Sequence, residues 1–306
     1  MSAPDSRIAL ASGPHPEGEM ARGQALTLIY IALTAASQVF LNHVGAGLPA
    51  AVSLFYMAAA ASLIFNLWEA RRIRRNHAAL CRYWPAWTAM SVAFVLNWIC
   101  SWYSVTHAPA DFFIAVFFLS SALCSCVRDR RLVKGVAIVS ALTTVWWLSG
   151  VDVIALITSL LAGAFMFIYY LSSVRFSQQS GLGPVSVVSL RCYLLLACCA
   201  FYLMEQQGVA ALALSKENLH SVLVLIVANM VLPSFLSQTC LQWVGVTVFT
   251  FMNSLIPLLA FLMQSALSGE WPVSMLLAMT LATLTLNHDR LLALVGRLTL
   301  RANRKG

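Results

Sequence analysis

Several polar side chains in this sequence stand inside long apolar stretches, where they can form hydrogen bonds or bind charge. Gln38, Asn42 and His43 close the first of these stretches. Gln38 and Asn42 are four residues apart, so on a helix they share one face. The spacing predicts a hydrogen-bonding wall with His43 as a titrating neighbour. The alternative is that all three are interfacial residues at a helix end.

A second group combines polar and aromatic side chains. Asn97 and Ser101 are four residues apart, and Trp98 and Trp102 form a parallel stripe, with Tyr103 next to it. A polar face beside an aromatic face suits an amphipathic ligand. Hydrogen bonds between helices, together with an aromatic belt at the membrane interface, explain the same pattern.

Asp111 opens a further apolar stretch, two residues after Pro109. A carboxylate there could bind a cationic group or a coupling proton at the outer mouth of a cavity. It could equally cap the helix, because Asp accepts hydrogen bonds from free backbone N–H groups. His107 is close in sequence, either as a partner of Asp111 or as a loop residue in water.

The second half of the chain offers a similar set of candidates, which comprises Tyr169, Asn229, Gln238 and Asn253. Asn229 and Gln238 flank Pro233, which interrupts the helical pattern. Interrupted membrane helices leave backbone groups free, and those groups often line binding sites. Lining a cavity and packing between helices explain these residues equally well.

The composition decides which elements carry these side chains. Of the 306 residues, 60% are hydrophobic and only 10% are charged, against about 25% charged in a soluble domain. Lipid must therefore be the solvent for most of the chain. One spanning helix needs about 20 apolar residues. We expect ten such helices, at approximately 24–43, 49–68, 85–106, 109–127, 133–149, 153–174, 186–204, 220–238, 244–266 and 272–288.

The basic residues predict the orientation in the membrane. Short runs of Arg lie between apolar stretches, at 71–82 and 128–134, and more lie in the C-terminal tail. If the N-terminus is cytoplasmic, every Lys and Arg except Lys216 falls on the cytoplasmic side, which is the positive-inside pattern. We expect Arg191, at the start of the seventh stretch, to extend to that surface. The net charge of +8 could suggest a nucleic-acid partner, but the placement of the basic residues in short runs between apolar stretches indicates instead a bacterial inner-membrane protein with both termini cytoplasmic.

The order of these segments predicts two similar halves. We expect a disordered cytoplasmic tail at 1–23, five-helix units at 24–149 and 150–290, and a basic cytoplasmic tail at 291–306. An odd number of helices per unit inverts the second unit relative to the first, and inverted repeats are a recurring transporter plan. The predicted fold is all-α, a polytopic membrane protein with ten transmembrane helices in two inverted five-helix repeats.

Short motifs at matching places in the two halves resemble those of one family. Residues 241–247 read LQWVGVT, followed by Pro257 in the next stretch and by Gly-Glu at 269–270. Residues 103–108 read YSVTHA in the first half, where Phe117 stands in place of the proline. In this order the motifs resemble those of the EamA type of the drug/metabolite transporter superfamily.

That resemblance implies an alternating-access carrier with both termini in the cytoplasm. Members export amino acids, other small metabolites, drugs or opine-type metallophores, through a cavity lined mainly by helices one, three, four, six, eight and nine. We therefore expect a secondary transporter that exports a small polar or amphipathic metabolite. Its candidate substrate-binding residues are Gln38, Asn42, His43, Asn97, Trp98, Ser101, Tyr103, Asp111, Tyr169, Asn229, Gln238 and Asn253.

The sequence predicts the bilayer and a small solute as partners, with no cofactor and no metal site. The eight cysteines have neither metal-ligand nor disulfide spacing. No GxxxxGK[ST] loop is present, so ATP cannot drive transport from this chain alone. The sequence does not decide whether protons are the coupling ion, nor whether the protein is a monomer or a homodimer.

A membrane-embedded enzyme acting on a lipid-like substrate is the alternative function. It needs a catalytic constellation inside the membrane, and the sequence contains no HExxH and no GxGD motif. A hydrogen-bonded approach of Asp111 to His43, beside a nucleophile, would favour the enzyme.

Overall fold

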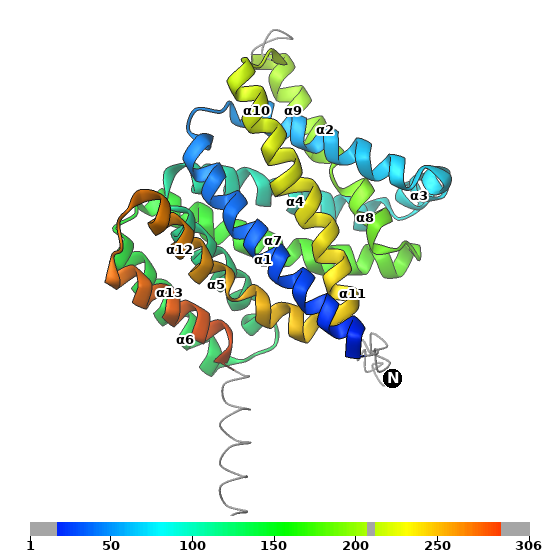
Figure 1. Ribbon diagram of the computed structural model, residues 1–306. Helices are drawn as coiled ribbons and strands as arrows, with labels where there is room; N and C mark the ends of the chain where they lie inside the picture. Colours follow the sequence, from blue (N-terminus) through cyan, green and yellow to red (C-terminus); the bar gives the residue numbers. More distant parts are fainter. Residues whose placement is uncertain (1–16, 207–211, 289–306) are drawn as a thin grey trace, which may run out of the picture.

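The structure is a computed structural model, and it describes residues 17–206 and 212–288. Every regular element in these ranges is a helix (Figure 1). In chain order the elements are α1 (Glu17–Gly45), α2 (Ala50–Trp68), η1 (Ala70–Arg72), α3 (Ile73–Arg82), α4 (Trp84–His107), α5 (Ala110–Arg128), α6 (Leu132–Ser149), α7 (Val153–Ser180), α8 (Pro184–Arg191), α9 (Tyr193–Gln206), α10 (Lys216–Leu225), η3 (Ile226–Val231), α11 (Leu232–Asn253), α12 (Ile256–Ser268) and α13 (Val273–Leu286).

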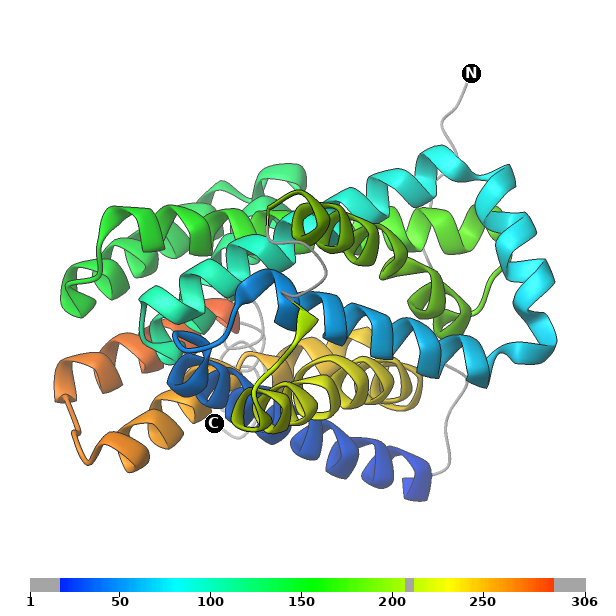
Figure 2. The same ribbon diagram turned by 90° about the horizontal axis from the view of Figure 1, so that it is seen from above.

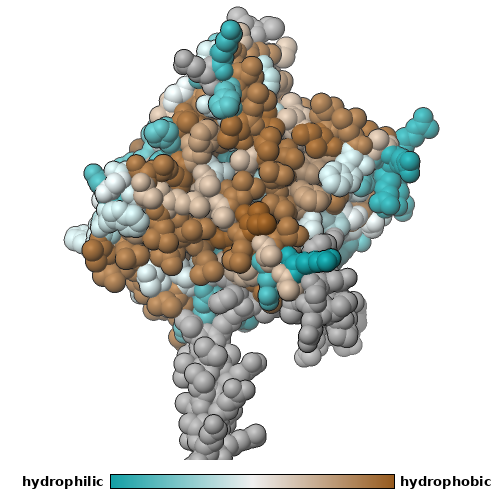
Figure 3. Space-filling model, viewed as in Figure 1, coloured by the Kyte–Doolittle hydropathy of each residue, from teal (hydrophilic) through white to brown (hydrophobic). Residues whose placement is uncertain are grey.

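Eight helical segments in the described part of the chain are long and apolar enough to cross a membrane. They comprise α1, α2, α4, α5, α6, α7, the α8–α9 pair and the run from α10 into α11, while α12 and α13 are shorter apolar helices. Apolar side chains also dominate the face shown in Figure 3. The chain is therefore an all-helical, multi-pass membrane protein.

The first helix begins earlier than the sequence predicts. Because α1 starts at Glu17, the prediction of a disordered tail over 1–23 is wrong for residues 17–23. The remainder of that tail and the predicted basic tail at 291–306 lie outside the described residues.

The seventh predicted stretch is divided in the structure. α8 ends at Arg191, Cys192 separates the two helices, and α9 begins at Tyr193. Arg191 is therefore the last residue of α8, directly before this break in the apolar segment.

The run α10–η3–α11 departs from the prediction in another way. The predicted break at 239–243 lies within α11, and the helix break falls instead at Ser254 and Leu255. The first part of the run lies antiparallel to α1. Asn229 hydrogen-bonds to Gln38, far along α1, whereas Cys240 packs beside Leu26 near the start of α1.

The later part of the run returns along α1 in the opposite direction. The ring centroids of Phe249 and Tyr30 are 5.3 Å apart. Further on, Gln264 Nε2 donates to Asn42 Oδ1 over 3.4 Å. The chain therefore reverses its direction within α11, close to where the sequence predicts the end of one segment and the start of the next.

A π-helical turn, η3, widens this run just before Pro233. Proline has no N–H, so in an α-helix the carbonyl of Asn229, four residues earlier, would lose its partner. π-turns occur inside helices, often at functional sites. Pro233 thus distorts the helix without ending it.

Helices from the first half of the chain pack against helices from the second half (Figures 1 and 2). α4 and α5 pack against α7, and η3, α11 and α12 pack against α1. α2 contacts α8 and α9, α6 contacts α13, and α5 contacts α12.

One contact between α5 and α7 is close enough to require glycine. A Cβ atom at Gly163 would lie 2.2 Å from the carbonyl oxygen of Phe117 and 2.8 Å from Ser120 Cβ. Ser120 Oγ also donates to the carbonyl of Leu160 over 2.7 Å. The backbones of α5 and α7 therefore meet at this point, which fixes how α7 lies in the bundle.

The short helix α3 is an element that the apolar pattern does not predict. Its arginines are exposed, and it is held at one side by His77, whose Nε2 lies 3.0 Å from Tyr193 Oη. Tyr193 in turn donates to Asn66 Oδ1 over 2.9 Å. These bonds tie α3 to α2 and to the start of α9.

Candidate functional site

Arg191 is buried inside the helix bundle, with 8% of its surface exposed. The prediction that it reaches the surface is therefore wrong. The spanning segment begins at Pro184, so Arg191 lies about 10 Å along it at a rise of about 1.5 Å per residue. Its side chain is directed towards neighbouring helices, at the junction of α8 and α9.

Side chains from three other helices surround the guanidinium of Arg191. Nη1 donates to Tyr169 Oη on α7 over 2.9 Å, and Nη2 donates to Ser234 Oγ on α11. The ring of Phe94 on α4 lies beneath it, with the guanidinium carbon 4.8 Å from the ring centroid. That geometry is a cation–π contact.

No carboxylate pairs with Arg191 in the part of the chain that the structure describes. The acid–base pairs found there, Arg72 with Glu69 and Arg128 with Asp129, lie at helix ends elsewhere. The Nε atom of Arg191 is buried and has no hydrogen-bond partner. The site therefore holds a positive charge and a free donor inside the bundle.

Gln38 and Asn229 form a second polar contact between helices. Gln38 Nε2 on α1 donates to Asn229 Oδ1 on η3 over 3.0 Å. Asn229 is 8% exposed, and its Nδ2 has no hydrogen-bond partner. Two of the predicted residues, far apart in sequence, are thus brought together.

Aromatic rings border this polar region. Tyr30 and Tyr170 lie near enough to Arg191 to interact with it electrostatically. The ring centroids of Tyr169 and Tyr170 are 5.5 Å apart, and Tyr170 is 50% exposed. Tyr169 therefore links the guanidinium of Arg191 to Tyr170 at the edge of the polar region. The name Arg191 cluster is used below for this set of side chains, which comprises Tyr30, Gln38, Phe94, Tyr169, Tyr170, Arg191, Asn229 and Ser234.

Other predicted residues hold helices together. Asn42 Nδ2 donates to the carbonyls of Val105 and Ala108 over 2.7 and 2.8 Å, which joins the ends of α1 and α4. Asn97 Nδ2 donates to the carbonyl of Ala162 over 2.9 Å, which joins α4 to α7. Buried amides bonded in this way are packing contacts.

The remaining candidates of α1 and α4 are spread out. His43 is exposed, and Ser101 is half-buried. Trp98 packs its ring edge-on against Phe94, with centroids 6.1 Å apart, so it lies next to the Arg191 cluster.

Two further candidates lie on α11. Asn253 is half-buried, and its Oδ1 has no hydrogen-bond partner. The side chain of Gln238 lies outside the described residues.

Asp111 is 4% exposed at the start of α5. Its Oδ1 accepts from the backbone N–H of Phe112 over 2.8 Å. The carboxylate therefore binds a free N–H group in the first turn of its own helix, and no described hydrogen bond joins it to His43.

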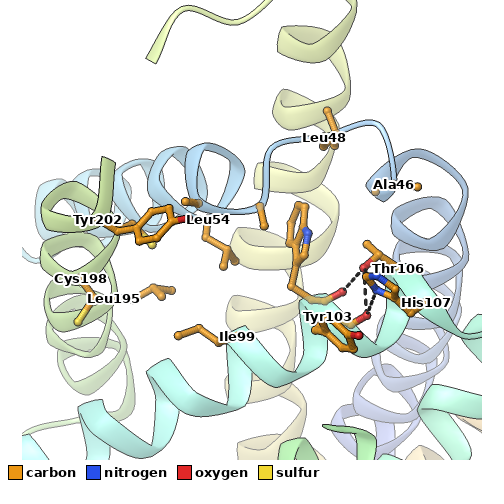
Figure 4. Close-up of a pocket in the computed structure, with 15 residues that line it drawn as sticks. Ala46, Leu48, Leu54, Ile99, Tyr103, Thr106, His107, Leu195, Cys198 and Tyr202 are labelled. Atoms are coloured by element: carbon orange, nitrogen blue, oxygen red, sulfur yellow. Dashed lines mark hydrogen bonds between the residues drawn. The ribbon is translucent and has the colours of Figure 1, made fainter. Parts of the chain in front are cut away.

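A pocket of about 670 Å³ opens between the end of α1, α2, α4 and α9 (Figure 4). Of the predicted candidates it includes Tyr103, whose ring stacks on His107 with centroids 4.1 Å apart. Its other walls are mainly apolar, with Leu54, Ile99 and Leu195 facing the space. Arg191 does not line it. Two of its helices, α1 and α4, are the first and third spans that the family resemblance implies, whereas α2 and α9 belong to the second and seventh spans.

A second pocket, of about 530 Å³, lies between the start of α4 and the end of α7. It is lined in part by Arg82, Arg175 and Gln179. None of the predicted candidates belongs to it.

Sequence reasoning missed the central residue of the site. Arg191 stood in the sequence as the one cation within the apolar stretch 186–204. Charges inside membrane helices are rare and usually functional, so this position was itself a signal. Assigning it to the helix end concealed that signal.

Comparison with known proteins identifies the fold without a family. No known protein family matches the chain, and no curated protein matches it. A solved structure described only as "Crystal structure of protein" is similar, with a TM-score of 0.62 and 15% sequence identity. The similarity covers 90% of this chain and 99% of the other, so the two share a fold over nearly their whole length.

Proposed function

We propose that this protein is a secondary transporter of a small polar or amphipathic metabolite, working by alternating access in a bacterial inner membrane. The observation that carries the proposal is the Arg191 cluster, a polar site built inside apolar helices from side chains far apart in sequence. Gln38 of α1 meets Asn229 of η3, and Arg191 of α8 meets Ser234 of α11.

Placing such a cluster inside a membrane raises the free energy of insertion, so such clusters are usually functional. A charged side chain at the centre of a membrane helix costs about 2.5–3.5 kcal/mol on insertion scales. The cluster also lies where helices are irregular, at the α8–α9 break and at the π-turn η3. Transporter sites are typically built from interrupted helices near the middle of the membrane.

We propose further that the chain has ten membrane segments in two inverted five-helix repeats, 24–149 and 150–290. α1, α2, α4, α5 and α6 then correspond to α7, α8–α9, α10 with η3, the end of α11 with α12, and α13. The packing supports this correspondence. Under this correspondence, the contact of α4 with α7 has its counterpart in the contact of η3 and α11 with α1. The contact of α5 with α7 likewise has its counterpart in the contact of α12 with α1.

The charges support the proposed orientation, and the proposed direction of transport comes from the family resemblance. With both termini cytoplasmic, the arginines of η1 and α3 face the cytoplasm, as the positive-inside rule favours. We propose export from the cytoplasm, in keeping with the resemblance to EamA-type carriers.

The test is a flux assay in inside-out vesicles that contain the full chain. Vesicles are loaded with a panel of amino acids, opines and toxic analogues, and uptake and efflux are compared with vesicles lacking the protein. We expect saturable movement of at least one solute, reduced by Asn229→Ala. Asn97→Ala is the matched control, because it removes a buried amide that packs α4 on α7.

A different outcome of the same assay would favour the membrane-embedded enzyme. If no solute moves in either direction while the purified protein converts a lipid, the membrane-embedded enzyme replaces the transporter. In the structure, the exposed His43 and the helix-bound Asp111 do not form the constellation that would favour the enzyme.

A further inference from the structure

The Arg191 cluster lacks an acceptor. A guanidinium has five N–H donors, and Arg191 uses one on Tyr169 and one on Ser234. Its Nε has no partner, and neither has Nδ2 of Asn229. Buried polar groups in proteins are almost always bonded, so two free donors in one cluster indicate a group that arrives from outside the chain.

The two free donors lie on neighbouring elements, because Arg191 on α8 bonds to Ser234 on α11, and η3, which carries Asn229, runs directly into α11. Asn229 and Ser234 are five positions apart along η3 and α11, and both are 8% exposed. Asn229 belongs to the π-turn η3, and Ser234 lies in the first turn of α11, which follows it.

We propose that Arg191 binds a carboxylate group of the transported solute, with the amide of Asn229 as a second donor. The inference rests on the transport function proposed above and names its substrate class, a small organic monoanion. The planar guanidinium fork matches the two oxygens of a carboxylate. The bound anion also balances a charge that the described residues leave unpaired.

The surroundings define the rest of the solute. Phe94, Trp98, Tyr169 and Tyr170 form an aromatic wall beside the guanidinium. This wall favours a carboxylate that carries an apolar or aromatic group. A phosphate dianion would leave one negative charge unbalanced, since no second cation of the described chain contacts the cluster.

The experiment measures thermal unfolding of the full chain in nanodiscs with defined probes. The carboxylates are phenylacetate, isovalerate and pyruvate, each compared with its primary amide, and inorganic phosphate is a further probe. A ligand that binds only the folded protein raises its unfolding temperature. The variants are Arg191→Gln, which keeps donors but loses the charge, and Arg191→Lys, which keeps the charge but loses the fork. Arg75→Gln, at an exposed arginine of α3, is the control.

We expect at least one carboxylate to raise the unfolding temperature of the wild-type protein and of Arg75→Gln, while its amide does not. Arg191→Gln should lose the response. Arg191→Lys should bind at least about tenfold more weakly, because a point charge replaces the bidentate contact. Tyr169→Phe, which removes only one hydroxyl from the cluster, is the second variant should Arg191→Gln fail to fold, and it should weaken the response to the carboxylate, which Arg75→Gln keeps.

Any one of the following binding results would overturn the assignment. They are no response to any carboxylate, an equal response to the amides, and an unchanged response in Arg191→Gln. A stronger response to phosphate than to every carboxylate would also overturn it.

Flux in vesicles separates this inference from the transport function. Solute movement that Arg191→Gln leaves unchanged retains the transporter and removes the anion site, whereas carboxylate binding without flux does the reverse.

Discussion

At the scale of single residues, the Arg191 cluster shows what residue types alone cannot decide. Asn42, Asn97 and Asn229 have the same side chain in the same kind of apolar stretch. The first two bond to backbone carbonyls and hold helices together, whereas Asn229 keeps a free donor. Which neighbour an amide meets depends on how the helices pack, and a sequence read one segment at a time does not contain that information.

The Gln38–Asn229 bond predicts a measurable coupling between two distant parts of the chain. In a double-mutant cycle, Gln38→Ala and Asn229→Ala should be non-additive by about 1 kcal/mol in the free energy of unfolding, the value of a partly buried hydrogen bond. The measurement is reversible unfolding of the purified protein in mixed detergent. Gln38→Ala combined with Asn97→Ala is the control, since Asn97 bonds to Ala162 elsewhere. Additivity in the first pair would contradict the contact.

At the scale of elements, the apolar pattern predicted α2, α4, α5, α6, α7 and α13 closely, because an apolar run of spanning length has few alternatives in lipid. It did not predict α3, the Cys192 break or η3. α3 is too polar to appear in a search for spanning segments. The Cys192 break has no Gly or Pro of its own, and the π-turn depends on how Pro233 is accommodated.

Pro233 should control the geometry of the cluster. In Pro233→Ala the restored N–H can bond to the carbonyl of Asn229, so η3 is expected to become α-helical and Asn229 to rotate away from Gln38. Amide exchange over 226–231 should slow, and flux per folded molecule should fall. Pro184→Ala is the matched control, because Pro184 stands in the first turn of α8, where a backbone N–H has no partner within the helix. Unchanged flux in Pro233→Ala would show that η3 does not position the site.

Gly163 should be intolerant of any side chain. A methyl group there would overlap the carbonyl of Phe117, so Gly163→Ala is expected to destabilise the protein by about 1–3 kcal/mol through forced separation of α5 and α7. Gly135→Ala, where the nearest atom is 4.0 Å away, should be neutral or stabilising by up to about 1 kcal/mol. Unfolding of both variants in the same detergent measures the difference. Equal stabilities would mean that the two helices are not in contact at this point.

At the scale of the whole molecule, the two proposed repeats predict a definite topology. In a chain without its native cysteines, Ala213→Cys before α10 should react with a membrane-impermeant maleimide in intact cells. Arg75→Cys on α3 should react only after the membrane is permeabilised. Both positions are exposed, so accessibility within the protein does not separate them. Reaction of both introduced cysteines from the same side of the membrane would contradict the inverted arrangement of the two repeats.

The unpaired charge of Arg191 has a kinetic consequence for such a carrier. When the site is empty, closing the bundle around the guanidinium leaves a cation without a counterion in a medium of low polarity, which is strongly unfavourable. A bound monoanion cancels that charge, so the loaded protein should change conformation faster than the empty one. Solute on the far side of the membrane should then accelerate efflux, and counterflow should exceed net movement down a gradient.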